Sequence, residues 1–299
     1  MFNRILVPLD GSEQAEIAIP YAEELARELR SEVVLYHVPG HEHAQQERMH
    51  HMYLDRLAET VKANIARGQD SSTARVTTIV EAGEPSENIC KLVDEYKVDL
   101  IVMTAVSASG LKIGRMLGSV ADHICRTVPI PVLLIRPQNI RQVGGHGRLI
   151  SRLLIPLDGS DLSRLALPVG EELAVKLKAS ITLFQMARIL MMYENGTGTN
   201  IVYANYAQFD EDEKKRVEAE MSVFDEDLKA RGLDVTHIVT SGVDAATDII
   251  ETEKKIDADL VVMSTHGRSG LSRWVLGNVA ERVLRHGEAP LLLVHARAS

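Results

Sequence analysis

Leu6-Val7-Pro8-Leu9-Asp10-Gly11-Ser12 returns 148 residues later as Leu154-Ile155-Pro156-Leu157-Asp158-Gly159-Ser160. A second pair of stretches, Asp99-Leu100-Ile101-Val102-Met103 and Asp259-Leu260-Val261-Val262-Met263, lies 160 residues apart. Two matches in the same order indicate a duplicated unit of about 150 residues, an ordinary length for one domain. The two offsets differ by 160 − 148 = 12 residues, so the second copy carries an insertion between the two motifs.

The duplication predicts a domain at residues 1–137, a linker at 138–150 and a second domain at 151–299. The linker is centred on Gly144-Gly145-His146-Gly147, a composition typical of flexible connections. The insertion falls at residues 187–208. Its core, Tyr193–Phe209, is rich in turn-forming residues and is either a functional loop or a disordered one. A charged helix is expected to start at Asp210–Lys215.

Each copy alternates short apolar runs with segments of helical periodicity. In the first copy we predict strands at 4–9, 33–38, 75–80, 100–104 and 132–135, and helices at 15–29, 48–66, 85–96 and 119–126. In the second copy we predict strands at 153–157, 181–185, 235–240, 260–264 and 291–294. The runs are continuously apolar, which is typical of parallel strands buried on both faces by helices. The sequence therefore predicts an α/β protein of two tandem, doubly wound, five-stranded parallel sheets of Rossmann-like type.

The final strand of each copy is short and apolar and is expected at the edge of its sheet. An unpaired edge strand invites association, and pairing residues 131–135 with 290–294 would cover both edges. We therefore expect the two halves to pack as a pseudo-two-fold dimer.

Composition restricts the class of protein. Hydrophobic residues make up 45% and charged residues 25% of the chain, which is typical of a globular protein. The net charge of −9 argues against a nucleic-acid partner, and no apolar stretch is long enough to predict a membrane span. Cys90 and Cys125 form no CxxC pair, so we expect buried, inert thiols in a reduced, cytoplasmic setting.

Polar residues follow the first and fourth strands of each copy, where ligands bind in open parallel sheets. Asp10 and Asp158 follow the first strands. After the fourth strand of the second copy comes Ser264-Thr265-His266-Gly267-Arg268-Ser269-Gly270, and Gly277-Asn278 then opens a helix. Asn278 is expected to cap this helix with Glu281 in a capping box, as Ser119 and Asp122 are in the first copy. A helix start of this kind favours phosphate, although a capped turn without any ligand fits the same residues.

The repeated P-L-D-G-S, D-L-V-V-M and H-G-R-S-G-L segments resemble the universal stress protein family over nearly the whole chain. The family's nucleotide motif is G-x-x-G, nine residues, then Gly followed by Ser or Thr. Gly267, nine residues and Gly277 match its central spacing, while Ser264 and Asn278 stand in place of the first glycine and the Ser/Thr. The resemblance implies two domains of the universal stress protein type and binding of ATP, ADP or AMP, with Mg²⁺ on the phosphates.

By this resemblance, Asp158 matches the acidic residue that contacts adenosine, and Met186, expected to end the second strand, matches a position that lines the adenine pocket. The complete predicted site comprises Pro156, Asp158, Met186, Met263, Ser264, His266, Gly267, Gly277, Asn278, Val279 and Ala280. The implied role is that of a stress-response regulator that forms a homodimer and has no catalytic or metal-ligating residues of its own.

The first copy departs from the motif. When Gly110 is aligned with Gly270, Ser107 replaces Gly267, and the loop up to Gly118-Ser119 is one residue longer. A lost glycine makes close backbone approach to a phosphate costly. We therefore expect a degenerate first site and one tightly bound nucleotide per chain.

Two alternatives remain open: a slow ATPase or adenylating enzyme of the same fold type, and a scaffold without any bound nucleotide. The chain has no Gly-Lys-Ser/Thr segment, and His266 is the one ionisable candidate in the second loop. A histidine cluster of His37, His41, His43, His50 and His51 is either a metal site or, as we expect, a solvated loop.

Overall fold

A computed structural model of the chain describes residues 2–39, 47–67, 74–106, 117–136, 148–188, 201–265 and 276–295, with backbone alone at 201–209. The elements of the first half are β1 (Arg4–Leu9), α1 (Glu13–Glu16), α2 (Ile19–Leu29), β2 (Glu32–His37), α3 (Glu47–Ile65), β3 (Val76–Val80), α4 (Pro85–Glu95), β4 (Leu100–Thr104), α5 (Ser119–Thr127) and β5 (Val132–Ile135). Those of the second half are β6 (Arg152–Leu157), α6 (Asp161–Arg164), α7 (Ala166–Leu177), β7 (Ser180–Arg188), α8 (Ile201–Ala230), β8 (Val235–Gly242), α9 (Ala245–Lys255), β9 (Leu260–Ser264), α10 (Asn278–His286) and β10 (Leu291–Val294).

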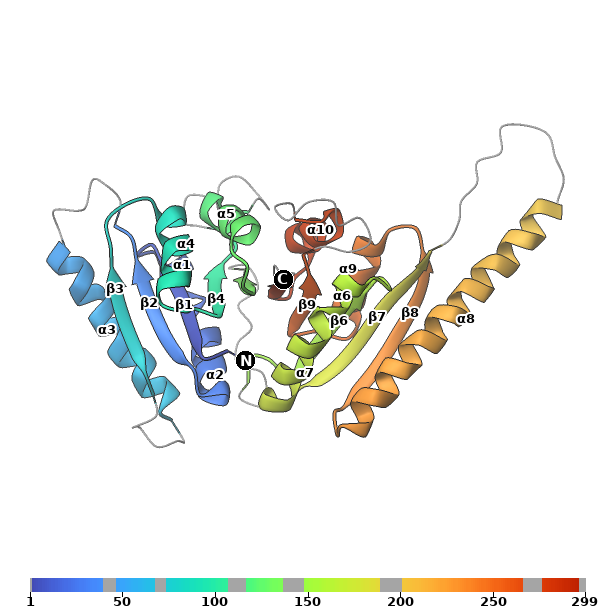
Figure 1. Cartoon of the computed structure of the whole chain (residues 1–299), viewed down its shortest axis with the longest axis horizontal. Coiled ribbons are helices and arrows are strands. Elements are labelled where there is room, and N and C mark those ends of the chain that lie inside the picture. Colours follow the sequence, from blue (N-terminus) through green and yellow to red (C-terminus); the bar gives the residue numbers. More distant parts are fainter. Residues whose placement is uncertain are drawn as a thin grey trace.

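The strands of the described residues form one continuous sheet in the order β3-β2-β1-β4-β5-β10-β9-β6-β7-β8 (Figure 1). Within each half the neighbouring strands are parallel, and β5 and β10 pair antiparallel with Leu133 opposite Leu292. The predicted α/β class, the ten strands and the pairing of the two final strands are all confirmed. The two halves are thereby related by a pseudo-two-fold arrangement.

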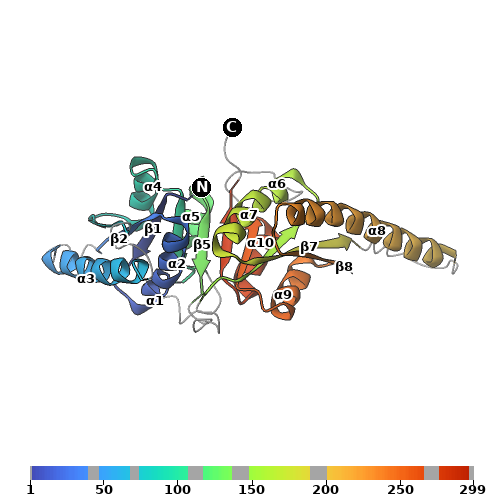
Figure 2. The ribbon, with the colours of Figure 1, turned by 90° about the horizontal axis from the view of Figure 1, so that it is seen from below.

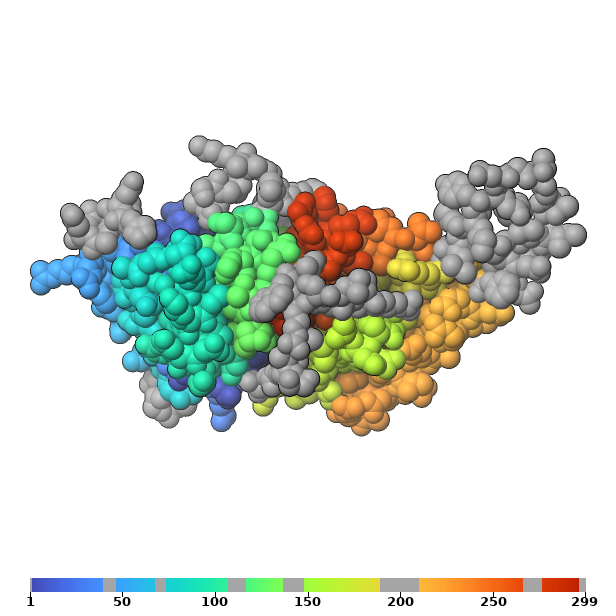
Figure 3. All heavy atoms as spheres, turned by 45° about the horizontal axis from the view of Figure 1, so that its top comes forward, coloured from blue at the N-terminus to red at the C-terminus, as the bar shows by residue number. Residues whose placement is uncertain are grey.

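Each face of this sheet is covered by helices from both halves. One core cluster joins apolar residues of α2 and α3 to those of α7 and α8, and the other joins α4 and α5 to α9 and α10. Figure 2 shows α3 and α8 at opposite ends of the molecule. In the space-filling view of Figure 3, the end of the first half (green) adjoins the end of the second (red). The halves therefore share both cores as well as the sheet.

The D-G-S turn that follows β1 and β6 is encoded locally. Gly11 and Gly159 have φ angles of 83° and 80°, a left-handed conformation that glycine adopts without strain. Ser12 caps α1, because its side chain accepts a hydrogen bond from the Ala15 amide. The predicted helix at 15–29 is nevertheless divided into α1 and α2, and Pro20 stands in the first turn of α2, where a missing N–H costs little.

The insertion is partly helical. Helix α8 begins at Ile201, so the predicted start at Asp210–Lys215 is wrong, and those residues lie inside a 30-residue helix that crosses one end of the sheet (Figure 1). Residues 189–200 lie outside the described residues, as do residues 138–147 of the predicted linker. Strand β7 pairs with β8 as far as Arg188, so Met186 lies within that strand and does not end it.

None of the helices in the described ranges combines the length and apolar character that a bilayer span requires.

Candidate functional site

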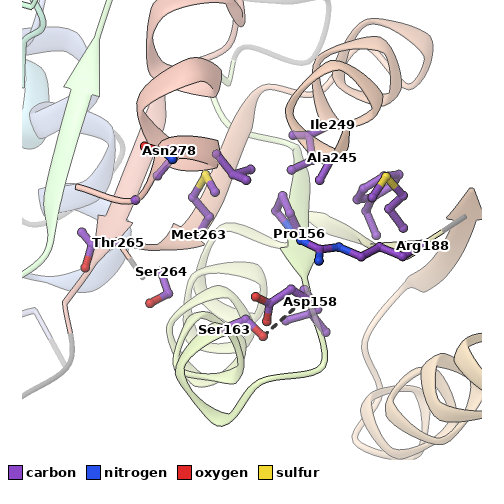
Figure 4. A pocket seen from close by; sticks show the side chains of 16 residues that line it. Pro156, Asp158, Ser163, Arg188, Ala245, Ile249, Met263, Ser264, Thr265 and Asn278 are labelled. Atoms are coloured by element: carbon purple, nitrogen blue, oxygen red, sulfur yellow. Dashed lines mark hydrogen bonds between the residues drawn. The ribbon is translucent and has the colours of Figure 1, made fainter. Parts of the chain in front are cut away.

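A cavity of about 290 Å³ opens beyond the C-terminal ends of β6, β7 and β9 (Figure 4). The predicted site residues that line it are Pro156, Asp158, Met186, Met263, Ser264, Gly277, Asn278, Val279 and Ala280. The other two, His266 and Gly267, lie outside the described residues. Residues that are far apart in the sequence therefore meet at one sheet edge, as expected for an open parallel sheet.

Asp158 is held by the turn that contains it. Its Oδ1 accepts hydrogen bonds from the Ser160 amide at 2.9 Å and from the Ser160 hydroxyl at 2.6 Å. Ser163, which also lines the cavity, accepts from the Asp158 amide at 3.2 Å, the contact drawn in Figure 4. The carboxylate is therefore fixed beside the cavity, and a carboxylate is an acceptor that suits hydroxyl groups of a ligand.

Helix α10 points its N-terminus at the cavity without a side-chain cap. The N-cap is Gly277, whose own amide donates to the Thr265 carbonyl at 2.9 Å, and Asn278 is already helical. The predicted capping box of Asn278 and Glu281 is therefore wrong, and Glu281 instead pairs with Arg285. The amides of the first helical turn have no acceptor within the helix, and the helix dipole makes this end electropositive.

The first half repeats this helix start. Gly118 is the N-cap of α5, without a side-chain hydrogen bond, and its amide donates to the Ala105 carbonyl at 2.8 Å. The predicted cap of Ser119 and Asp122 is also wrong, because Asp122 pairs with Arg126. In both copies the glycine amide is bound to the carbonyl of the residue that follows the preceding strand. Each helix begins one residue earlier than a cap at Asn278 or Ser119 would place it.

The opposite side of the cavity is apolar. Phe184 and Met186 of β7 and Ile249 of α9 contribute to it, while Met263 of β9 lies nearer to α10 (Figure 4). Helices α9 and α10 are joined by Arg282, whose guanidinium bonds both carboxylate oxygens of Asp244 at 2.6 and 2.7 Å. This pairing lowers the pKa of Asp244 to about 2. The cavity therefore combines an apolar side, one fixed carboxylate and an electropositive helix end.

A second cavity, of about 120 Å³, occupies the equivalent place in the first half. Each residue that lines it has a positional counterpart in the larger cavity: Asp10 corresponds to Asp158, for example, and Gly118 to Gly277. Tyr36 replaces Phe184 and donates its hydroxyl to Glu81 at 2.8 Å. Ser107 and Gly110, on which the prediction of a degenerate loop depends, lie outside the described residues.

Sequence reasoning missed several residues of the larger cavity: Leu157, Ser163, Phe184, Arg188, Ala245, Ile249 and Thr265. Strand periodicity carries a signal for two of them, because residues two positions before and after Met186 share its side of β7. No local pattern indicates that α9 contributes Ala245 and Ile249, since that contact is formed by the folding of the chain.

The predicted solvated histidine loop is wrong for His37, which is buried, while His51 on α3 is exposed. His37 Nδ1 lies 2.8 Å from the Leu9 carbonyl oxygen and its Nε2 lies 2.9 Å from His50 Nδ1. Burial lowers the pKa of His37. Among the described residues no group of three or more metal-ligating side chains is assembled; His41 and His43 lie outside them.

The two cysteines are both free. Cys125 is buried in α5, and burial raises the pKa of its thiol to about 12. Cys90 is half-buried, so the prediction of a buried thiol is wrong there, although the pKa of its thiol is also raised, mainly by burial. A thiol with a raised pKa forms little thiolate near neutral pH and is therefore a poor nucleophile.

Comparison with known proteins shows a family match in each half. The universal stress protein family matches residues 1–136 and again residues 150–295. Universal stress protein Rv2623 of Mycobacterium tuberculosis is 22% identical over 97% of this chain and 95% of its own. Universal stress protein MJ0577 of Methanocaldococcus jannaschii is 27% identical over 46% of this chain and 98% of its own.

The fold as a whole also has a solved counterpart. The crystal structure of a universal stress protein from Archaeoglobus fulgidus superposes with a TM-score of 0.69 at 18% identity, covering 99% of this chain and 97% of that one. The similarity spans both halves and the junction between them. This chain belongs to the universal stress protein family.

Proposed function

We propose that this chain is a cytoplasmic stress-response regulator that binds one adenine nucleotide, ATP, ADP or AMP, in the cavity of its second half. The observation that carries the proposal is the uncapped start of α10. It lines the same cavity as the fixed carboxylate of Asp158, and the opposite side of that cavity is apolar. Phosphate suits the free amides of the helix, ribose hydroxyls suit Asp158, and a purine base suits Phe184 and Met186.

The size of the two cavities supports one nucleotide per chain. Small-molecule sites usually measure about 300–1,000 Å³. The second-half cavity, at about 290 Å³, is close to that range, whereas the first-half cavity, at about 120 Å³, is far below it. We therefore expect the first half to stabilise the shared sheet and to remain without nucleotide.

The proposed role is regulatory and not that of a dedicated catalyst. Asp158 is the one carboxylate among the described residues that line the cavity, so Mg²⁺ would arrive on the nucleotide phosphates. A turnover near 1 s⁻¹, roughly the low end for kinases, would contradict this role and favour an ATPase or adenylating enzyme. Assembly into a homodimer of chains belongs to the same proposal and is tested by light scattering.

The binding site is tested by calorimetric titration of ATP into the wild-type chain and two matched variants. Gly277→Val places a branched side chain where phosphate approaches α10 and is expected to weaken ATP binding about tenfold or more, a loss of at least ~1.4 kcal/mol. Gly118→Val makes the same change at the start of α5 and is expected to leave ATP binding unchanged.

ATP at about 100 times its Kd should also stabilise the wild-type chain by roughly 2.7 kcal/mol. Equal ATP affinity of the wild-type chain and Gly277→Val would overturn the assignment of the site. Two equivalent sites would show that the first half binds nucleotide as well. No heat of binding and no thermal shift would favour a scaffold without nucleotide.

A further inference from the structure

Arg188 distinguishes the second cavity from the first. Fifteen of the sixteen residues that line the larger cavity have a counterpart lining the smaller one, and Arg188 is the exception. Its positional equivalent, 148 residues earlier, is Gly40, which lies outside the described residues and has no side chain beyond hydrogen. Whatever Arg188 contributes to the larger cavity is therefore specific to the second half.

The side chain of Arg188 extends into the cavity from the end of β7 (Figure 4). Phe184, Met186 and Arg188 stand two positions apart on β7, so their side chains share one side of the strand and all three line the cavity. Asn278, at the start of α10, appears at the opposite side of the cavity in the same view. Arg188 thus belongs to the apolar side of the cavity and lies away from the helix end that suits phosphate.

Arg188 is exposed, and its guanidinium makes no hydrogen bond or ion pair with the described residues. A free arginine at the mouth of an apolar pocket is suited to a flat ligand, because the planar guanidinium stacks on aromatic faces and is more weakly hydrated than an ammonium. A base packed against Phe184 and Met186 would present its other face to solvent, on the side where Arg188 projects.

We propose that Arg188 is a specificity-determining residue that stacks on the purine base and closes the cavity over it. The inference rests on the proposed function, since it names what holds the base of the same nucleotide. In this role Arg188 selects ligands with a flat ring system at this end of the cavity, and it adds nothing to the recognition of phosphate.

Titration of both ATP and adenosine, which lacks phosphate, separates stacking from charge. Arg188→Gln removes the guanidinium plane and is expected to raise the Kd of both ligands by the same factor, about 5- to 30-fold. Arg188→Lys keeps the charge without the plane and should lose most of the adenosine affinity as well. Arg56→Gln, which removes an exposed arginine on α3, is the control and should change neither Kd.

A loss confined to ATP and restored by Arg188→Lys would overturn the inference, because it would show that Arg188 acts on phosphate. Unchanged binding of both ligands by Arg188→Gln would overturn it as well, while leaving the proposed function intact. Failure of the wild-type chain to bind either ligand would overturn the proposed function itself. A fluorescent adenosine analogue gives an independent readout, since its quenching on binding should decrease in Arg188→Gln.

Discussion

At the scale of the residue, the duplicated halves place different side chains in the same buried position. His37 in β2 corresponds to Gln185 in β7, at the offset of 148 residues, and both are almost fully buried. Because the Leu9 carbonyl only accepts, His37 Nδ1 carries the proton of neutral His37, and its Nε2 then accepts from His50. Protonation of His37 turns its Nε2 into a donor, so this contact is kept only if His50 changes tautomer.

This geometry predicts a pH dependence that His37→Gln removes. Burial lowers the pKa of folded His37 from its ordinary value of 6.5, so the unfolded chain binds the proton more tightly. The contribution of His37 to the free energy of unfolding is complete above pH 6.5. It is lost as the pH falls from 6.5 through the pKa of folded His37. His37→Gln should flatten the decrease in Tm between about pH 7.5 and pH 5.5, and each tenfold change in proton affinity corresponds to about 1.4 kcal/mol.

Thermal denaturation across this pH range is the measurement. His51→Gln is the control, because His51 is exposed on α3, the helix that carries His50. An equal decrease in Tm for the wild-type chain and His37→Gln would show that groups other than His37 carry the pH dependence.

At the scale of the element, α10 starts without the side-chain cap that would stabilise it. Gly277 has φ −62° and ψ 146°, an extended conformation that any residue adopts, so the glycine is not required by backbone strain. An acceptor side chain at this N-cap would stabilise the helix. The glycine supplies no such acceptor to the first-turn amides, which are the groups that the proposed function assigns to phosphate.

Gly277→Asp should therefore stabilise the free chain and weaken ATP binding. The carboxylate would cap α10 and raise the free energy of unfolding by about 0.5 kcal/mol, while its charge repels the phosphates. Gly118→Asp, at the start of α5, should give a similar gain in stability without a change in ATP affinity. Chemical denaturation and calorimetric titration measure the two effects; tighter ATP binding by Gly277→Asp would contradict the role given to this helix end.

At the scale of the whole molecule, the halves are joined by more than the β5–β10 pair. Glu24 on α2 of the first half is buried, and its carboxylate accepts the amides of Leu149 and Ile150, which lead into the second half, at 2.7 and 3.0 Å. In addition, Arg136 donates to the Val283 carbonyl of α10 at 2.6 Å. We therefore expect the chain to unfold as one unit.

Glu24→Ala should destabilise the whole chain. The variant leaves two buried amides without an acceptor, at a cost of about 1–3 kcal/mol each. Glu24→Gln keeps one acceptor oxygen and should cost less. Differential scanning calorimetry is expected to show one transition at a lower temperature for Glu24→Ala, with Glu59→Ala, an exposed position, as control. A separate transition of one half at a lower temperature would contradict the expectation that the chain unfolds as one unit.

The sequence by itself determined the duplication, the ten strands, the α/β class and most of the described cavity residues. Strands are apolar runs between turn residues, and the D-G-S turn needs a left-handed glycine, so both are encoded by neighbours in the chain. The edge position of residues 132–135 and 291–294 was also sufficient to predict that the two halves pair.

Only the tertiary structure decided the features that depend on distant contacts. Helix α10 begins at Asn278 because the Gly277 amide is bound to Thr265, and His37 is buried because α3 brings His50 and Tyr53 onto it. Arg188 joins the cavity because β7 continues along β8, beyond the end that local hydropathy indicates. Helix capping and side-chain burial depend on which partners are nearby in space, and those partners are set by the packing of elements that lie far apart in the chain.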